Sequence, residues 1–206
     1  MPAWVPLPEW PGGDAYVIGG GASLTGFRWQ RLQGRNTIGC NSAFKLGAQI
    51  CSLCFFSDEE FFNRYEDELA AYAGRVVTHC ESISFAHPWV LRAPRRYAGL
   101  HKDGIGFGGN SGCSAINLAL LLGARRVFLL GFDCQRNPST GRTHWHDDPV
   151  GGSSGTPDLY QKFIEGFQDV ARSLQQVFPG TKVYNCSPTS VLTCFPKANL
   201  DEFLPP

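Results

Sequence analysis

The densest cluster of polar side chains in this sequence is the stretch GRTHWHDD, which holds two histidines and two aspartates. In an extended loop, His144 and His146 project to the same side because successive side chains alternate. Histidine titrates near neutral pH, so either one could act as a general base or contact a phosphate group. The pair could also ligate a metal ion with Asp133, Asp147 or Asp148. A solvated loop without a chemical role is the third interpretation.

Asp133 follows the apolar stretch from Arg126 to Leu130, which predicts a buried strand. In α/β enzymes a carboxylate at such a place commonly holds Mg²⁺ or a ribose hydroxyl, although it can also cap a turn. Asp133 is therefore a candidate catalytic residue and a candidate ligand of Mg²⁺, with the turn cap as the alternative.

Three consecutive glycines, Gly19, Gly20 and Gly21, follow a short apolar stretch and precede Ser23. Glycines let backbone N–H groups approach phosphate oxygens because no side chain stands in the way, and the serine hydroxyl adds a donor. The loop matches neither G-x-G-x-x-G nor a Walker loop. It predicts contact with a phosphate or a nucleotide, and the alternative is a tight strand exit without a ligand.

A second glycine-rich segment, from Gly108 to Gly112, opens the most regular predicted helix. The free N–H groups and the positive dipole end of a helix N-terminus favour an anion. Asn110, Ser111 and Gly112 are therefore candidate nucleotide contacts, although Asn110 or Ser111 could serve only as the helix cap. Asn41 ends another predicted strand, and its amide suits a base or ribose edge as well as a turn.

The elements that must position these residues alternate between apolar strands and helices over short connections. This order predicts one Rossmann-like α/β domain with a mainly parallel sheet and helices on both faces. In such sheets ligands bind at the carboxyl ends of the strands, where the candidate residues would gather. The expected elements are strands at 14–18, 36–41, 50–56, 75–79, 126–130 and 182–185, helices at 27–32, 59–72, 111–122 and 157–178, and irregular stretches at 81–107 and 134–155.

Length and charge limit the function classes. A chain of 206 residues can bury a core as a single domain, so we expect one nucleotide-binding domain over 1–206 with peripheral tails at 1–13 and 197–206. Lys plus Arg and Asp plus Glu both number 18, so net charge does not favour stable nucleic-acid binding. No apolar run predicts a membrane span or a signal peptide, and we expect a cytoplasmic protein.

The eight cysteines do not predict a disulfide framework or a zinc site. Several fall within predicted strands or a helix, and without an export signal they should be reduced. Cys51 and Cys54 are three residues apart on a predicted strand, so they would point to opposite faces, and no second C-x-x-C completes four ligands. Composition also allows a homo-oligomer, without identifying an interface.

Four short motifs, taken together and in order, resemble two related families. One is the 6-hydroxymethylpterin diphosphokinase-like family, which includes motility accessory proteins, and the other is the bacterial sialyltransferases that modify lipooligosaccharide. A compact chain without a basic membrane-binding tail also looks like proteins carried by bacteriophages. The motifs are VIGGGASL at 17–24, GCNSAF at 39–44, GNSG at 109–112 and LGARRVFLLGFD at 122–133.

The resemblance to the sialyltransferases implies a glycosyltransferase that uses a nucleotide-activated sugar, of the CMP type, with an unknown acceptor. It implies His144 or His146 as the base, and the nucleotide-binding residues Gly19, Gly21, Ser23, Asn41, Asn110 and Ser111. The resemblance to the diphosphokinases implies instead pyrophosphoryl transfer from ATP, with Asp133 binding Mg²⁺. A nucleotide-binding protein that has lost its chemistry is the third possibility.

Overall fold

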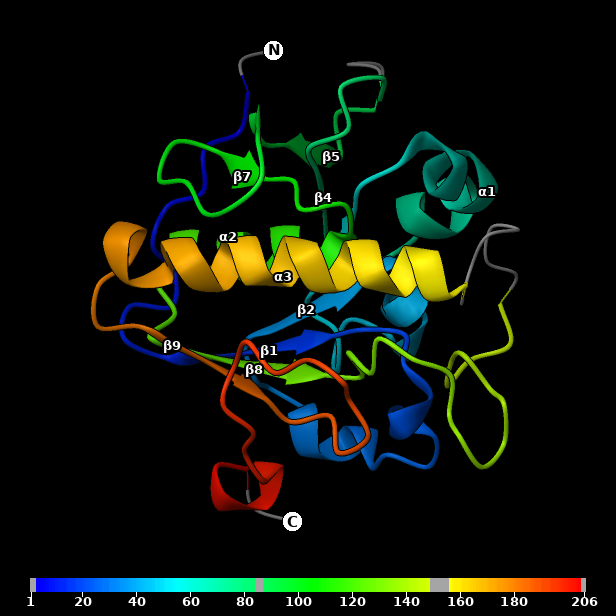
Figure 1. Cartoon of the computed structure of the whole chain (residues 1–206). Coiled ribbons are helices and arrows are strands. Elements are labelled where there is room, and N and C mark those ends of the chain that lie inside the picture. The colour runs from blue at the N-terminus through cyan, green and yellow to red at the C-terminus, as the bar shows by residue number, and fades with distance from the viewer. Residues whose placement is uncertain (1–2, 84–86, 149–155, 205–206) are drawn as a thin grey trace.

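A seven-stranded parallel sheet forms the centre of the molecule in the computed structural model, which describes residues 3–83, 87–148 and 156–204 (Figure 1). The strand order is β5-β4-β3-β2-β1-β8-β9, and every neighbouring pair is parallel. The strands are β1 (Asp14–Ile18), β2 (Thr37–Cys40), β3 (Leu53–Phe56), β4 (Arg75–Thr78), β5 (Val90–Arg92), β8 (Arg126–Leu130) and β9 (Lys182–Asn185), while β6 (Arg95–Arg96) and β7 (Ile105–Gly106) pair separately.

Helices cover both faces of this sheet, as expected from the sequence. Side chains alternate along each strand, so Ala15 and Val17 of β1 face one core, and Tyr16 and Ile18 face the other. The first core is covered by α2 (Ser111–Leu121), over which α3 (Pro157–Val177) lies (Figure 1). The opposite face is covered by α1 (Glu59–Ala70) and by the 3-10 helices η1 (Ala22–Leu24), η2 (Trp29–Leu32), η3 (Asn41–Leu46) and η4 (Leu200–Glu202).

The chain reverses its direction across the sheet at β1. From β1 it proceeds through β2, β3 and β4 to the edge strand β5, and then returns through α2 to β8 on the other side of β1. The loops after β1 and β8 therefore diverge at neighbouring strand ends. In open α/β sheets this switch point is where a ligand-binding crevice forms.

The predicted strands and long helices are confirmed: three strands have the expected bounds, and the other elements are shorter by one to three residues at one or both ends. The fifth strand, β5, lies in the stretch 81–107 that we expected to be irregular. It consists of only three residues at the sheet edge, too few to show a periodic pattern. The expected helix at 27–32 is a single 3-10 turn, η2. The part of the expected loop at 149–155 lies outside the described residues.

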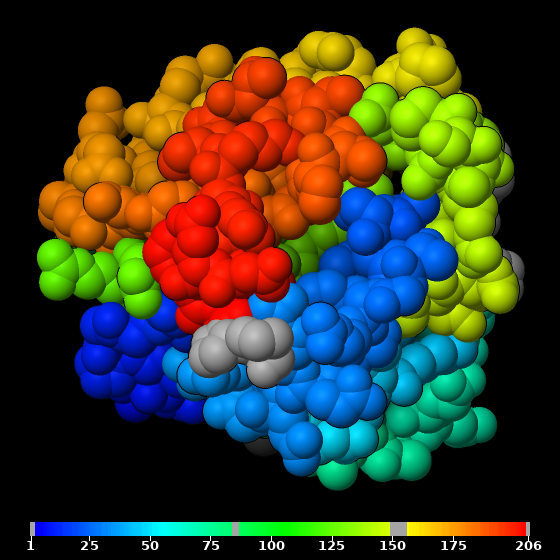
Figure 2. Space-filling view, turned by 90° about the horizontal axis from the view of Figure 1, so that it is seen from below, coloured from blue at the N-terminus to red at the C-terminus, as the bar shows by residue number. Residues whose placement is uncertain are grey.

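The described residues nearest to both chain ends pack on the rest of the fold. The Trp4 N–H donates to the carbonyl oxygen of Arg92 on the edge strand at 2.7 Å. At the other end, Leu204 is fully buried and Arg31 forms an ion pair with Asp201 at 2.6 Å. Figure 2 shows this C-terminal segment, in red, seated beside the blue segment that follows β1. All eight cysteines are free thiols, and no helix in the described parts is long and apolar enough to cross a membrane.

Candidate functional site

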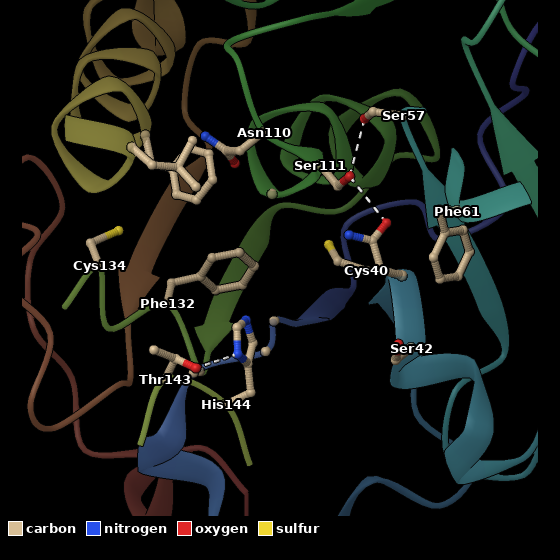
Figure 3. Close-up of a pocket in the computed structure, with 18 of the residues that line it drawn as sticks. Cys40, Ser42, Ser57, Phe61, Asn110, Ser111, Phe132, Cys134, Thr143 and His144 are labelled. Atoms are coloured by element: carbon tan, nitrogen blue, oxygen red, sulfur yellow. Dashed lines mark hydrogen bonds between the residues drawn. The ribbon is translucent and has the colours of Figure 1, made fainter. Parts of the chain in front are cut away.

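A cavity of about 500 Å³ opens at the carboxyl ends of the strands, at the switch point between β1 and β8 (Figure 3). Its walls come from the loops after β1, β2, β3 and β8, from the start of α2, and from the first halves of α1 and α3. The sequence-predicted residues that line it are Gly19, Gly20, Gly21, Asn41, Asn110, Ser111, Gly112, Asp133, His144 and His146. Three residues named as candidates from the sequence lie outside this lining: Ser23, Asp147 and Asp148.

The triple-glycine loop is built for close contact with the end of β8. The N–H groups of Gly19 and Gly21 donate to the carbonyl oxygens of Leu130 and Gly131, each at 2.8 Å. A Cβ atom on either glycine would lie 2.6 Å from the Gly131 oxygen, so both positions exclude any side chain. Packing of the chain on itself therefore explains these two glycines. The N–H of Gly20, which has no partner among the described residues, is the one this loop leaves for a ligand.

Ser23 and Asp133 satisfy each other instead of facing a ligand. The Ser23 N–H donates to Asp133 Oδ2 at 2.8 Å, and the Ser23 hydroxyl donates to Oδ1 at 2.5 Å. Asp133 is 3 % exposed, so these two bonds compensate a carboxylate that water barely reaches. The pair ties the loop after β1 to the loop after β8. This contact corrects the expectation that Ser23 is free to hold a phosphate. It also agrees with the alternative in which Asp133 stabilises a turn.

The residues present do not fit a bound Mg²⁺ at Asp133. Both oxygens of its carboxylate are held by Ser23, and Mg²⁺ needs several oxygen ligands in an octahedral arrangement. Across residues 3–83, 87–148 and 156–204, no group of three or more His, Cys, Asp or Glu side chains is placed to hold a metal ion.

The start of α2 presents unpaired donors to the cavity. Asn110 is the helix cap: its Oδ1 accepts from the Cys113 N–H at 3.0 Å, and its Nδ2 donates to the Cys113 sulfur at 3.2 Å. The capping alternative for Asn110 thus holds. No backbone hydrogen bond from the N–H of Ser111 or of Gly112 is found among the residues described, and both groups lie at the positive end of an eleven-residue helix. This arrangement can bind a phosphate.

Asn41 connects the end of β2 to the same helix start. Its Oδ1 accepts from the Ser111 hydroxyl at 3.4 Å, and Ser111 also contacts the Ser57 hydroxyl at 3.1 Å (Figure 3). The backbone of Asn41 has φ of +52°, a left-handed conformation that asparagine tolerates better than most residues. Strained backbone of this kind persists where surrounding contacts hold it, and it is concentrated at binding sites.

The histidine loop is fixed to the glycine loop. Trp145 donates from its backbone N–H to the Gly20 oxygen at 3.0 Å and from its indole N–H to the Gly19 oxygen at 2.9 Å. Gly21 and His144 form an antiparallel bridge, and the Trp145 ring packs on the Trp29 ring with 4.9 Å between centroids. Two segments more than 120 residues apart in sequence are therefore joined by backbone and side-chain contacts.

The two histidines lie side by side in the cavity wall, with 5.2 Å between ring centroids. His144 has one ring nitrogen, Nδ1, on the Thr143 hydroxyl at 2.7 Å, and Figure 3 shows its other nitrogen directed into the cavity. Burial and the neighbouring His146 lower the pKa of His144 to about 4. Burial also lowers the pKa of His146, partly opposed by Asp148. Both imidazoles are neutral at pH 7, the form in which histidine accepts a proton.

Sequence reasoning missed the aromatic part of the cavity wall. Phe61 and Tyr65 from α1 and Tyr160 and Phe163 from α3 line the cavity together with Phe132. In the sequence these rings have the helical spacing of core residues, so the pattern does not distinguish a cavity wall from a packed interior. An aromatic wall can pack against a nucleobase or the apolar face of a sugar.

No protein-family model matches this sequence, and no curated protein matches it in sequence. Solved structures do share its fold. The sialyltransferase CstII from Campylobacter jejuni, in complex with cytidine-5'-monophosphate, is 16 % identical with a TM-score of 0.53, over 90 % of this chain and 84 % of that one. The monofunctional α-2,3-sialyltransferase Cst-I from the same organism is 15 % identical with a TM-score of 0.53, over 90 % and 80 %.

A third structure is the MAf glycosyltransferase from Magnetospirillum magneticum AMB-1, at 13 % identity and a TM-score of 0.57. The alignment covers 96 % of this chain and 35 % of that protein, so this chain spans about a third of its length. The chain therefore has the α/β fold of these glycosyltransferases.

Proposed function

We propose that this protein is a glycosyltransferase that takes a nucleotide-activated sugar as donor, with a cytidine monophosphate nucleotide favoured. The observation that carries the proposal is the cavity at the switch point, which is lined both by the start of α2, with the N–H groups of Ser111 and Gly112, and by two neutral histidines. The fold shared with CstII, which was solved with cytidine-5'-monophosphate, supports the choice of nucleotide.

Each part of the cavity has a place in this reaction. The donor phosphate lies at the N–H groups of Ser111, Gly112 and Gly20, where the helix dipole favours negative charge. The Asn41 amide contacts the ribose or the base. A hydroxyl oxygen of the acceptor attacks the anomeric carbon, the bond from that carbon to the phosphate oxygen breaks, and the nucleotide leaves. The hydroxyl proton passes to one histidine of the His144–His146 pair.

Nucleotide binding is the first test. Isothermal titration with CMP, UDP and ATP, each with and without EDTA, should give binding of CMP that EDTA does not change. The variant Asn41→Gly removes the amide while keeping a residue that adopts φ of +52° without strain, so it should bind CMP more weakly at unchanged stability. If none of the three nucleotides binds, the proposal is wrong.

The same titration separates the two other functions that the sequence allows. ATP binding that requires Mg²⁺ and disappears with EDTA would favour pyrophosphoryl transfer. Tight CMP binding with no release of CMP from any CMP-activated sugar, together with unchanged binding in a His144→Ala, His146→Ala double variant, would favour a nucleotide-binding protein without catalysis.

A further inference from the structure

His146 has one ring nitrogen on each side of the cavity wall. Its Nε2 lies beside the glycine loop, 3.6 Å from the position that a Cβ atom on Gly20 would take. Its Nδ1 is buried on the other side and has no hydrogen-bond partner within the described chain. Burying a polar atom without a hydrogen-bond partner costs on the order of 1–3 kcal/mol of folding free energy, so the groups around His146 Nδ1 are of interest. The closest charged group to this nitrogen is a carboxylate.

That carboxylate belongs to Asp148, whose Oδ2 lies 3.8 Å from His146 Nδ1. Lys45 holds the other oxygen, Oδ1, at 2.9 Å. Burial would raise the pKa of Asp148, but hydrogen bonds from Lys45 and Ser42 outweigh it and leave the pKa below its ordinary value. Asp148 is therefore ionised at pH 7. The side chain of Asp148 is 19 % exposed and that of His146 12 %, so water screens their attraction only partly.

His144 has no such partner among the residues that the structure describes. Its Nδ1 meets the neutral hydroxyl of Thr143, which cannot compensate a positive charge as a carboxylate does. The other charges near the pair are Arg142 and Asp147, which bond to each other at 2.8 Å on the exposed side of the loop, and Glu68, which lies 3.6 Å from the Lys45 nitrogen. Among the charged groups that act on His146, Asp148 has the largest influence that favours a protonated imidazole.

We propose that His146 is the residue of the pair that accepts the acceptor proton, and that Asp148, held by Lys45, is its positioning residue. This inference rests on the proposed glycosyl transfer. The carboxylate keeps the proton of neutral His146 on Nδ1, which leaves the Nε2 lone pair toward the cavity. When Nε2 takes the hydroxyl proton, the imidazolium that forms is stabilised by Asp148, and the proton later leaves to solvent. Closure by roughly 0.8 Å turns the 3.8 Å contact into a hydrogen bond.

The chain provides a matched pair of variants. Asp148→Asn removes the carboxylate at His146, whereas Asp147→Asn removes the adjacent carboxylate, whose side chain is 95 % exposed and paired with Arg142. Histidine side-chain NMR of the full chain reports the tautomer and the pKa of His146 without any need for activity. We expect the Nδ1–H tautomer in the wild type. Asp148→Asn should lower the His146 pKa and shift the tautomer, and Asp147→Asn should change both much less.

Kinetics with CMP as the leaving nucleotide give the second readout. Asp148→Asn should lower kcat by at least about tenfold with the donor KM unchanged, and should move the acid limb of the pH profile to lower pH, because a lower pKa keeps His146 neutral further into acid. His146→Ala should lower kcat by about 10²–10⁴-fold. A structural role alone would not move the acid limb.

The two readouts fail separately. An Nε2–H tautomer in the wild type, or equal effects of Asp148→Asn and Asp147→Asn on the His146 pKa, overturns the positioning role whatever the activity. If the NMR result is as expected but no nucleotide-activated sugar is turned over, the His146–Asp148 pair stands and the proposed glycosyl transfer is wrong. A His144→Ala variant that loses more kcat than His146→Ala overturns the choice of proton acceptor.

Discussion

Adding one methyl group at two neighbouring glycines should separate folding from chemistry. In Gly21→Ala the new Cβ atom would lie 2.6 Å from the backbone oxygen of Gly131 and 2.7 Å from the carboxyl carbon of Asp133. In Gly20→Ala it would instead lie 2.8 Å from Cδ2 of His144, a side-chain atom. Neither glycine has a positive φ, so alanine adopts the backbone conformation of both positions and only the contacts differ.

The size of each effect follows from what can move. An ordinary contact needs 3.4 Å, so in Gly21→Ala the ends of β1 and β8 must separate by roughly 0.8 Å. That movement strains the backbone bonds between the two loops, and overpacking of this kind costs about 1–3 kcal/mol. For a domain of this size the melting temperature should fall by roughly 2–12 °C. In Gly20→Ala the imidazole of His144 can rotate away, so stability should change by less than about 1 kcal/mol.

Urea unfolding measures the two free energies, and titration with CMP followed by donor turnover measures the site. Gly21→Ala should be the less stable variant, while Gly20→Ala should keep its stability and lose turnover because His144 and the adjacent His146 are displaced. A Gly21→Ala protein as stable as the wild type would refute the argument that the glycine loop exists for contact with β8. Full turnover in Gly20→Ala would refute the placement of the histidines over Gly20.

Two further predictions concern the parts of the fold around the site. His79 is 1 % exposed, and its burial, with a smaller effect of the nearby Arg95, lowers its pKa to about 4. In the unfolded chain this histidine has its ordinary pKa of about 6.5, so it binds a proton at higher pH than in the folded protein. The free energy of unfolding therefore falls as the pH falls from 6.5 toward 4. Between pH 7 and pH 5 we expect His79 to account for a loss of about 2 kcal/mol in the free energy of unfolding. In urea unfolding, the stability of His79→Gln should therefore depend less on pH than that of the wild type. An equally steep pH dependence in the variant would contradict the lowered pKa of His79. A Cβ atom on Gly166 of α3 would lie 1.8 Å from the backbone oxygen of Gly108. Gly166→Ala should therefore lower the melting temperature, although alanine has the better helix propensity. A higher melting temperature would show that α3 does not pack against the loop at Gly108.

The fold was predictable because its signal is local and repeated. Apolar stretches such as 14–18 and 126–130 end abruptly at a glycine, which is typical of buried strands. The segment at 157–177 is amphipathic, which is typical of a helix that packs its apolar face on a core. The edge strand β5 was not predictable, since three residues cannot show a period and its pairing with β4 depends on the returning chain. Alternation of strands and helices was enough to place the cavity at the carboxyl edge of the sheet.

The roles of individual site residues were less predictable because they depend on long-range contacts. The sequence around Ser23 would look the same whether this serine held a phosphate or, as here, donated both of its hydrogen bonds to Asp133, 110 residues away. Asn110 likewise turns out to be the cap of α2, one of the two roles its position allows. Lys45 carried no signal at all: it lies in η3, and its contact with Asp148 arises only because the histidine loop folds back across the sheet edge.

The glycine loop contacts both β8 and the histidine loop through its backbone. The N–H groups of Gly19 and Gly21 hold β8, and the carbonyl oxygens of Gly19 and Gly20 hold Trp145 between the two histidines. The loop therefore fixes the histidines through its oxygens while one free N–H remains for a ligand. Gly20 and Trp145 are joined by one hydrogen bond of 3.0 Å, so displacing Gly20 would strain that bond. The backbone N–H that faces no partner and the placement of the histidines therefore depend on the same short backbone segment.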